Sequence, residues 1–255
     1  MRTIFKYIPT ILTLLFCLSF ATPIIAQQSN GAAQVAPVLH TELSLSYQVS
    51  EPKEMRAETP MVIMLHGYRS NETNFLRLKN NFPSHFLFVS VQAPIAYSDT
   101  HFAWYGLDFS TDEKKPNLEE AAESRKKLAK FIKELQQKYA VAPDQTFLLG
   151  FSQGAIMSTS MGLLRPDLVG GVVPISGRLP KAVDFEQSSE TTYPSFLIIH
   201  GESDEVISVG EAYGTLKKLN DLGAKKVDRL FHPDGHTITP DVIRTINEWF
   251  EVNAF

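Results

Sequence analysis

Short, almost continuous apolar segments alternate with longer amphipathic segments along most of the chain. The apolar segments are residues 61–65, 86–91, 146–149, 170–175 and 196–199, with a weaker one at 227–231. Apolar runs of this length indicate strands that are covered on both faces, as in a parallel sheet. Segment 43–49 instead alternates apolar and polar residues, which predicts a half-buried edge strand.

Helical patterns lie between these strands. Asn117 can cap a helix that runs to about Tyr139, with apolar residues on one side and Lys and Glu on the other. Further helices are expected at about 153–164, 210–222 and 240–252. Repeated strand and helix order predicts an α/β fold with a mostly parallel, doubly wound sheet flanked by helices.

The N-terminus has the pattern of a secretory signal peptide. Arg2 and Lys6 precede an apolar run at residues 8–20, and a small residue, Ala26, suits the cleavage site. We therefore expect a signal peptide at 1–26, a flexible lead at 27–39 and one catalytic domain at 40–255. The run is shorter than the ~20 residues of a membrane span, so a retained anchor is the less favoured alternative.

Export limits the chemistry that the mature chain can use. Cys17, the one cysteine, lies in the signal segment, so cysteine-based catalysis and disulfides are excluded. Cleavage would remove Arg2 and Lys6 and change the formal net charge from −4 by two units to −6. This mild acidity argues against nucleic acid or an anionic membrane as partner. A periplasmic or secreted protein is expected, without a stable membrane anchor; its oligomeric state is left open.

The segment Gly150-Phe-Ser-Gln-Gly154 follows an apolar strand and opens a helix. In this context the G-x-S-x-G pattern predicts a nucleophile elbow with Ser152 as the nucleophile. The two glycines would leave room for a tight, strained turn that exposes the serine hydroxyl. An ordinary helix-capping serine is the alternative for these five residues taken alone.

Partners for Ser152 occur further along the chain. His236, between a short strand and the last helix, is the expected general base, and His232 is its competitor. Asp204 follows a buried strand, and the order Ser, Asp, His is that of α/β-hydrolases. Glu202 and Glu205 remain alternatives for the acid.

Acyl transfer also needs donors for the oxyanion of the tetrahedral intermediate. One should be the backbone N–H of Gln153, directly after the nucleophile. The second should come from the turn Leu65-His-Gly-Tyr68, where Gly67 allows the amide of Tyr68 to point into the site. His66 is expected to be a structural hydrogen-bonding residue beneath that turn.

Four segments together resemble the phospholipase/carboxylesterase family, which includes acyl-protein thioesterases and small bacterial carboxylesterases. They are residues 65–75, 150–155, 200–206 and Gly235-His236, and the similarity covers roughly residues 40–255. The resemblance implies an α/β-hydrolase with Ser152, Asp204 and His236 as its triad. It also implies Tyr68 and Gln153 at the oxyanion hole, and no metal or organic cofactor.

Two further residues are pocket candidates by this resemblance. Trp104, in Ala103-Trp-Tyr105, is similar in position to a tryptophan that shapes the family's acyl pocket, with plain core packing as the alternative. Arg69 is a departure, because many family members have a second glycine there; beside the oxyanion turn it could narrow the pocket or meet an anionic leaving group.

These observations predict an exported serine carboxylesterase that acts on a small-molecule ester of short to medium acyl chain. A lysophospholipase, thioesterase or peptidase on the same fold is the alternative within the enzymes. A non-catalytic binding protein is the alternative outside them, since a fold does not fix a function.

Overall fold

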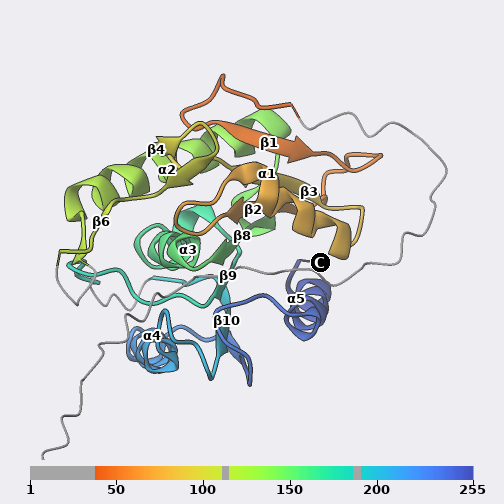
Figure 1. The fold of residues 1–255 in the computed structure, drawn as a ribbon. Coiled ribbons are helices and arrows are strands. Elements are labelled where there is room, and N and C mark those ends of the chain that lie inside the picture. The colour runs from red at the N-terminus through yellow and green to blue at the C-terminus, as the bar shows by residue number, and fades with distance from the viewer. Residues whose placement is uncertain (1–37, 111–114, 186–190, 255) are drawn as a thin grey trace, which may run out of the picture. The chain divides into compact units, whose positions relative to one another are not determined.

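A seven-stranded sheet forms the centre of the described part of the chain (Figure 1). The computed structural model describes residues 38–110, 115–185 and 191–254, so the predicted signal peptide and most of the predicted lead lie outside the described residues. The strands, in order across the sheet, are β1 (Tyr47–Ser50), β3 (Leu87–Val91), β2 (Met61–Leu65), β8 (Thr146–Phe151), β9 (Gly171–Ile175), β10 (Ser195–Gly201) and β11 (Val227–His232). Only β1 pairs antiparallel within this sheet, which confirms a mostly parallel sheet.

Helices cover both faces of the sheet. Those packed on one face are α2 (Leu118–Tyr139), α3 (Gln153–Leu164) and α4 (Val209–Asp221). Those packed on the other are α1 (Glu72–Leu76) and α5 (Pro240–Asn253). Strand β2 shows why its apolar run is unbroken: Ile63 packs into the first core and Val62 into the second. A strand between two helical layers has no solvent-facing side.

Helix α2 follows the sequence prediction closely. The Asn117 side chain accepts a hydrogen bond from the Glu120 backbone N–H at 3.2 Å, which caps the first turn. Its buried residues include Leu128, Phe131 and Leu135, the apolar side of the expected amphipathic pattern. The helix ends at Tyr139, and its C-cap residue Ala140 has a left-handed φ of 52°.

The edge strand differs from the prediction. It was expected at 43–49, but β1 begins at Tyr47. The backbone N–H of Ser44 donates instead to the Glu134 carboxylate of α2 at 2.8 Å. That contact bridges 90 positions in the sequence, so local alternation of residues could not reveal it.

Smaller elements complete the described fold. Two short hairpins pair β4 (Ile95–Ser98) with β5 (His101–Ala103) and β6 (Leu107–Asp108) with β7 (Lys115–Pro116). Three 3-10 turns span Arg77–Asn81, Pro143–Gln145 and Pro166–Leu168. In the ranges that the structure describes, no helix has both the length and the apolar character that a membrane crossing requires.

The strand ends decide where a site can form. Ser152 follows β8, residues 66–68 follow β2, residues 202–208 follow β10, and residues 233–239 follow β11. These four strands are parallel members of one sheet, so their carboxyl ends meet at the same edge. Ligand sites of open α/β sheets lie at that edge.

Candidate active site

Ser152 occupies a strained turn between β8 and α3. Its φ of 55° and ψ of −117° lie outside the regions that non-glycine residues favour. Its backbone N–H donates to the Ile175 carbonyl at 2.9 Å, which ties the turn to the end of β9. The backbone therefore holds one serine at the carboxyl edge of the central strand.

The glycines on either side of Ser152 make this turn possible. A Cβ atom at Gly150 would lie 2.8 Å from the Cα of Ala155, and one at Gly154 would lie 2.7 Å from the His66 carbonyl oxygen. Both distances are shorter than real Cβ contacts. The strand, the helix and the turn after β2 thus approach each other closely enough to exclude side chains.

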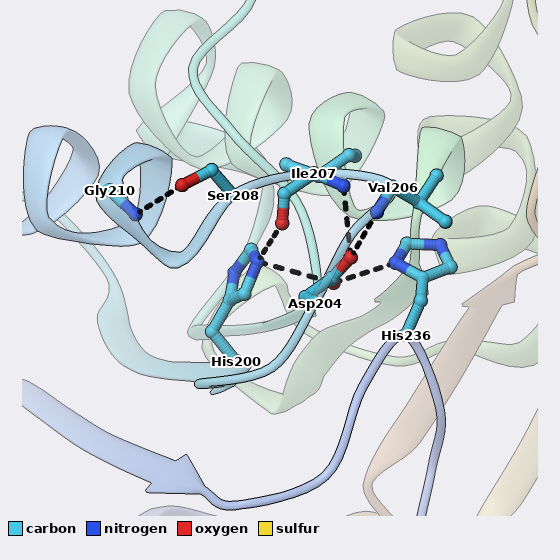
Figure 2. Close-up of polar contacts among 7 residues, drawn as sticks. All are labelled: His200, Asp204, Val206, Ile207, Ser208, Gly210 and His236. Atoms are coloured by element: carbon cyan, nitrogen blue, oxygen red, sulfur yellow. Dashed lines mark hydrogen bonds and ion pairs between the residues drawn. The ribbon is translucent and has the colours of Figure 1, made fainter.

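Asp204 and His236 form a hydrogen-bonded pair. Nδ1 of His236 lies 2.7 Å from Oδ2 of Asp204, and because a carboxylate only accepts, Nδ1 carries the hydrogen (Figure 2). The Asp204 side chain is fully buried, whereas that of His236 is 16% exposed. This arrangement leaves Nε2 of His236 as the nitrogen that can accept a proton.

The loop after β10 supplies further donors to Asp204. The backbone N–H groups of Val206 and Ile207 each donate to Oδ1 at 2.9 Å. Burial by itself raises the pKa of Asp204, but the hydrogen bonds from Ile207, His236 and Val206 and the attraction of His236 outweigh it and lower the pKa overall. The carboxylate is therefore held ionised despite its burial.

The His236 ring packs against Phe151, the residue that precedes Ser152. The ring centroids of Phe151 and His236 are 4.8 Å apart. Within the described residues no hydrogen bond joins Ser152 to His236. Catalytic hydrogen bonds are often long in unliganded enzymes and shorten when substrate binds.

The competing candidates have other surroundings than Asp204 and His236. His232 is buried at the end of β11, and its Nδ1 lies 3.4 Å from the Asp234 carboxylate. Glu202 and Glu205 are both exposed. Of the carboxylates in the described ranges, the one recorded in contact with His236 is that of Asp204.

The predicted oxyanion donors lie beside Ser152. A Cβ atom at Gly67 would be 3.3 Å from the Cβ of Ser152, so the turn after β2 faces the nucleophile directly. Gln153 is the first residue of α3, where backbone N–H groups have no acceptor within the helix. No acceptor among the described residues is recorded for the N–H of Tyr68. Two backbone amides near Ser152 are thus without an acceptor among the described residues.

His66 supports that turn from below. It is fully buried; its Nδ1 lies 2.8 Å from the Gly67 carbonyl, and its Nε2 accepts from the Ala93 N–H at 3.2 Å. Burial lowers the pKa of His66 to about 4. A neutral imidazole with both nitrogens engaged agrees with the structural role predicted for it.

A cleft of about 540 Å³ opens beside Ser152. Its apolar lining residues are Leu107, Phe109, Ile156, Val206 and Ile207. Tyr68, Tyr105 and Arg178 also line it. The nucleophile therefore lies in a mixed apolar and polar pocket of the size that small organic ligands occupy. In the described part of the chain, no cluster of three or more His, Cys, Asp or Glu side chains could hold a metal ion.

Comparison with known proteins decides the family. The family model described as Phospholipase/Carboxylesterase matches residues 47–254. This chain belongs to the phospholipase/carboxylesterase family. It is therefore an ester-hydrolysing enzyme of the carboxylesterase and thioesterase type.

Named members of the phospholipase/carboxylesterase family agree with this assignment. Acyl-protein thioesterase 1 of Yarrowia lipolytica is 29% identical over 215 residues, 77% of this chain and 93% of that protein. The carboxylesterase structure from Mesorhizobium loti has a TM-score of 0.74 at 22% identity, covering 85% of this chain and 99% of that one. The Bacillus cereus carboxylesterase structure has a TM-score of 0.71 at 19% identity, covering 83% and 95%. Both structures are similar in fold.

Trp104, a pocket candidate from the family resemblance, lies in the core instead. It is fully buried; its backbone N–H donates to Gln153 at 2.8 Å and its indole N–H donates to the His66 carbonyl at 3.0 Å. Its carbonyl accepts from the Ser124 hydroxyl. These contacts turn the indole inward, so its neighbour Tyr105 lines the cleft and Trp104 does not.

Arg69, the other pocket candidate, is exposed and does not line the cleft. Its guanidinium lies 5.0 Å from the centroid of the Tyr97 ring, a cation–π contact. Its φ of 55° is left-handed, where glycine carries no strain. This backbone conformation gives a physical reason why many members of the phospholipase/carboxylesterase family have glycine there.

Three residues at the site were given no role by sequence reasoning. His200 contacts Asp204, and Tyr105 and Arg178 line the cleft. His200 stood inside the quoted segment 200–206, so its place at a strand end next to the acid was a usable signal. Arg178 follows β9, outside every recognised segment, and its position becomes visible only when the strands are assembled.

Proposed function

We propose that this chain is an exported serine carboxylesterase that hydrolyses short- to medium-chain acyl esters through an acyl-enzyme on Ser152. One observation carries the proposal: Ser152 stands on a strained turn at the same sheet edge as the hydrogen-bonded pair Asp204 and His236. Serine, histidine and aspartate in these settings are the parts of a nucleophilic triad.

In the first half of the reaction, Ser152 Oγ forms a bond to the ester carbonyl carbon and its proton passes to Nε2 of His236. The carbonyl oxygen becomes an oxyanion, which the backbone N–H groups of Tyr68 and Gln153 stabilise. Asp204 accepts from Nδ1 and stabilises the imidazolium. The carbon–oxygen bond to the alcohol then breaks, and His236 returns the proton to the leaving oxygen.

In the second half, a water molecule gives a proton to Nε2 of His236 while its oxygen attacks the acyl carbon. The same two amides stabilise the second oxyanion. The bond to Ser152 Oγ breaks, and Oγ takes the proton back from His236, which releases the acid. Each cycle consumes one ester and one water and returns the enzyme unchanged, so ping-pong kinetics are expected.

The cleft supports the proposed chain length. Leu107, Phe109 and Ile156 offer apolar contact to an acyl chain, and about 540 Å³ suits a small substrate. Phe109 is exposed, so the pocket opens to solvent. A series of 4-nitrophenyl esters of increasing chain length measures this directly: kcat/KM should peak at short to medium chains, and a maximum at long chains would contradict it.

Replacement of the nucleophile tests the whole proposal. Ser152→Ala should abolish turnover of a short 4-nitrophenyl ester and prevent labelling by a fluorophosphonate probe, because no hydroxyl remains at the turn. Ser84→Ala is the matched control, since Ser84 is exposed and precedes the opposite end of β3. Intact turnover in Ser152→Ala would refute the assignment, and an unlabelled, inactive wild-type protein would favour a non-catalytic binding role.

A thioesterase is the second candidate, because several relatives are named acyl-protein thioesterase 1. Matched oxoesters and thioesters of one acyl group separate the two activities. The carboxylesterase proposal expects the oxoester to have the higher kcat/KM. A hydrolysed peptide bond would instead favour the peptidase alternative.

Export is tested apart from catalysis. The charged and apolar pattern at residues 1–26 supports cleavage near Ala26. N-terminal sequencing of the protein recovered from the periplasm or medium should find a start close to residue 27. A protein that keeps Met1 in the cytoplasm would contradict export and leave the esterase proposal untouched.

A further inference from the structure

A second imidazole, that of His200, contacts Asp204, the acid of the proposed triad. His200, near the end of β10, is 1% exposed, and its Nε2 lies 2.8 Å from the Ile207 carbonyl and 3.3 Å from Oδ2 of Asp204 (Figure 2). A carbonyl can only accept, so Nε2 carries a hydrogen, which it donates to the Ile207 carbonyl, and this Nε2–H group lies beside Oδ2 of Asp204. In Figure 2, His200 and His236 lie on opposite sides of Asp204.

The second ring nitrogen of His200 is enclosed by the protein. Nδ1 is buried, and no hydrogen-bond partner for it is recorded in the described part of the chain. Nε2 is therefore the nitrogen through which His200 contacts Ile207 and Asp204.

The surroundings of His200 add little charge. The small cavity beside it is lined from β9, α3 and α4 by the uncharged Pro174, Thr159 and Thr215. Arg178 contributes the one formal positive charge to that lining. The ionisable side chains in line with His200 are therefore Asp204, which it contacts, and His236, which lies beyond Asp204.

From this geometry we propose that His200 is a positioning residue, which holds Oδ2 of Asp204 against His236 and closes the loop that binds Oδ1. The inference rests on the proposed function. The hydrogen bond from His200 to the Ile207 carbonyl joins the two ends of segment 200–207. The Val206 and Ile207 amides donate to Oδ1 from within that segment. The carboxylate thus meets segment 200–207 at both oxygens, through hydrogen bonds at Oδ1 and through the contact with His200 at Oδ2.

Removal of this donor has a specific consequence. Without the polar Nε2–H group of His200 beside it, more of the charge on Oδ2 is directed at His236, which stabilises the imidazolium. The acidic limb of the pH profile of kcat/KM should then move to higher pH. The freed carboxylate should also hold His236 less accurately, which lowers kcat while KM stays nearly constant.

Two substitutions separate the loss of the hydrogen-bond donor from the loss of side-chain volume. His200→Leu keeps an apolar volume without a donor, and His200→Gln offers an amide N–H near the place of Nε2. We expect about a 10-fold or larger fall in kcat for His200→Leu, because the contact with Asp204 and the hydrogen bond to Ile207 are lost together. His200→Gln should recover most of kcat and return the acidic limb toward the wild-type position.

His232→Leu is the matched control. His232 is the buried histidine that pairs with Gly201 at the end of the neighbouring strand β11, and its recorded ion-pair partner is Asp234. Its loss should leave the acidic limb in place. If His200→Leu does not fold, His200→Asn replaces it, because its shorter amide does not reach Asp204.

Two outcomes would overturn the inference: a folded His200→Leu enzyme with wild-type kcat and pH profile, or equal impairment in the Leu and Gln variants with an unmoved acidic limb. Fluorophosphonate labelling of Ser152 distinguishes this failure from failure of the proposed function. If the wild type is labelled and either outcome is found, the proposed role of His200 is refuted while the proposed function stands.

Arg178 carries a second, independent inference. It follows β9, lines the cleft beside Ser152 and is half-buried. Its Nη1 donates to the Leu179 carbonyl at 3.0 Å, and no carboxylate of the described residues lies within ion-pair distance. Burial raises the pKa of the Tyr105 hydroxyl, and the positive charge of the nearby Arg178 opposes this shift.

The remaining charges of the cleft are more exposed than Arg178. Lys181, Glu205 and Glu211 all line it, but each is exposed to solvent. Water and salt screen exposed charges more than partly buried ones. The guanidinium therefore has the strongest influence on a ligand inside the cleft, and its fork of donors matches a carboxylate or a phosphate.

We infer that the preferred ester carries an anionic group, which Arg178 binds while Ser152 attacks the ester carbonyl; this too rests on the proposed function. Monomethyl succinate against methyl butyrate tests a carboxylate on the acyl side. Butyryl-glycerol phosphate against monobutyrin tests a phosphate on the alcohol side. Wild type should favour one anionic ester over its neutral match by about 10-fold or more in kcat/KM.

Arg178→Gln should abolish that preference, so that the ratio of kcat/KM for the anionic ester to that for its neutral match falls about 10-fold or more. Arg165→Gln is the control, an arginine directly after α3 whose partner is Asp167. Equal kcat/KM for anionic and neutral esters in the wild type, or an unchanged preference in Arg178→Gln, would overturn the inference. Hydrolysis of the neutral esters in either case leaves the proposed function standing.

Discussion

Two carboxylates of this molecule have lowered pKa values for different reasons. Glu42 lies on the surface beside α2, with its side chain 48% exposed, 2.5 Å from Lys138 Nζ and 2.7 Å from the Tyr47 hydroxyl. Those hydrogen bonds, Lys138 first, lower the pKa of Glu42 to about 2. Asp204 is fully buried, and its lowered pKa persists against the opposing effect of burial.

This difference shows which groups with a shifted pKa can be assigned a catalytic role. A lowered pKa alone is shared by a surface ion pair and by the proposed triad acid, so it identifies neither. Asp204 differs because its ionised form is desolvated, receives hydrogen bonds from the backbone and faces an imidazole. Glu42 instead accepts hydrogen bonds from Lys138 and Tyr47, and its side chain is exposed to solvent.

The largest expected contrast is in catalysis. Asp204→Asn should lower kcat by about 10⁴-fold, because an amide can donate to Nδ1 of His236 and favour the wrong tautomer. Glu42→Gln, which also replaces a carboxylate by its amide, should keep kcat within about twofold. Rates on a short 4-nitrophenyl ester measure both. A mild effect at Asp204 would move the acid role to Glu202 or Glu205.

The tight turn at Gly154 and the exposed helix position at Gly214 should differ in how well they tolerate an added side chain. A Cβ atom at Gly154 would overlap the Leu65 carbonyl, whereas one at Gly214 in α4 would meet nothing within 4 Å. Gly154→Ala should therefore lower the free energy of unfolding by about 2 kcal/mol or more, as overpacking does. Gly214→Ala should raise it by about 0.5–1 kcal/mol, as expected within an exposed helix.

Urea denaturation measures this pair, and the slope of each transition reports whether the surface exposed on unfolding is unchanged. Equal effects of the two alanines would mean that the catalytic edge tolerates movement of β8 against the turn after β2. That result would weaken the argument that backbone contacts fix Ser152 beside Gly67.

The sequence predicted whatever depends on local signals. Apolar periodicity and the Asn117 cap defined α2 to within a residue, and Gly150 and Gly154 marked the turn that carries Ser152. Asp204 and His236 were found because each follows a strand end and parallel strands bring such ends together.

Side-chain direction was less predictable, because contacts from distant segments decide it. Trp104 points into the core because Gln153 and His66, both far along the chain, accept its N–H groups. Arg69 turns outward onto Tyr97 of a hairpin that residue patterns did not reveal. His200 stands in a recognised segment, yet its contact with Asp204 depends on how segment 200–207 folds.

Acid should affect the two carboxylates in the same direction and to different extents. A lowered folded-state pKa contributes stability that is fully present above the unfolded-state pKa and is lost as the pH falls through the folded value. For Asp204 the loss begins below about pH 4, the unfolded value for Asp. The gap in urea midpoint between wild type and Asp204→Asn should therefore narrow as the pH falls below about 4. A constant gap would contradict an ionised Asp204.

The smallest effect is expected at Glu42. Its contribution should be complete above its ordinary pKa of 4.5 and should disappear as the pH falls toward about 2. Because the pair with Lys138 is exposed, added salt should shrink the difference in Tm between wild type and Glu42→Gln at neutral pH. Salt should change the corresponding difference for Asp204→Asn much less, since buried charges are poorly screened. Equal salt dependence in both would show that Asp204 is as open to water as Glu42, and the distinction between the two carboxylates would fail.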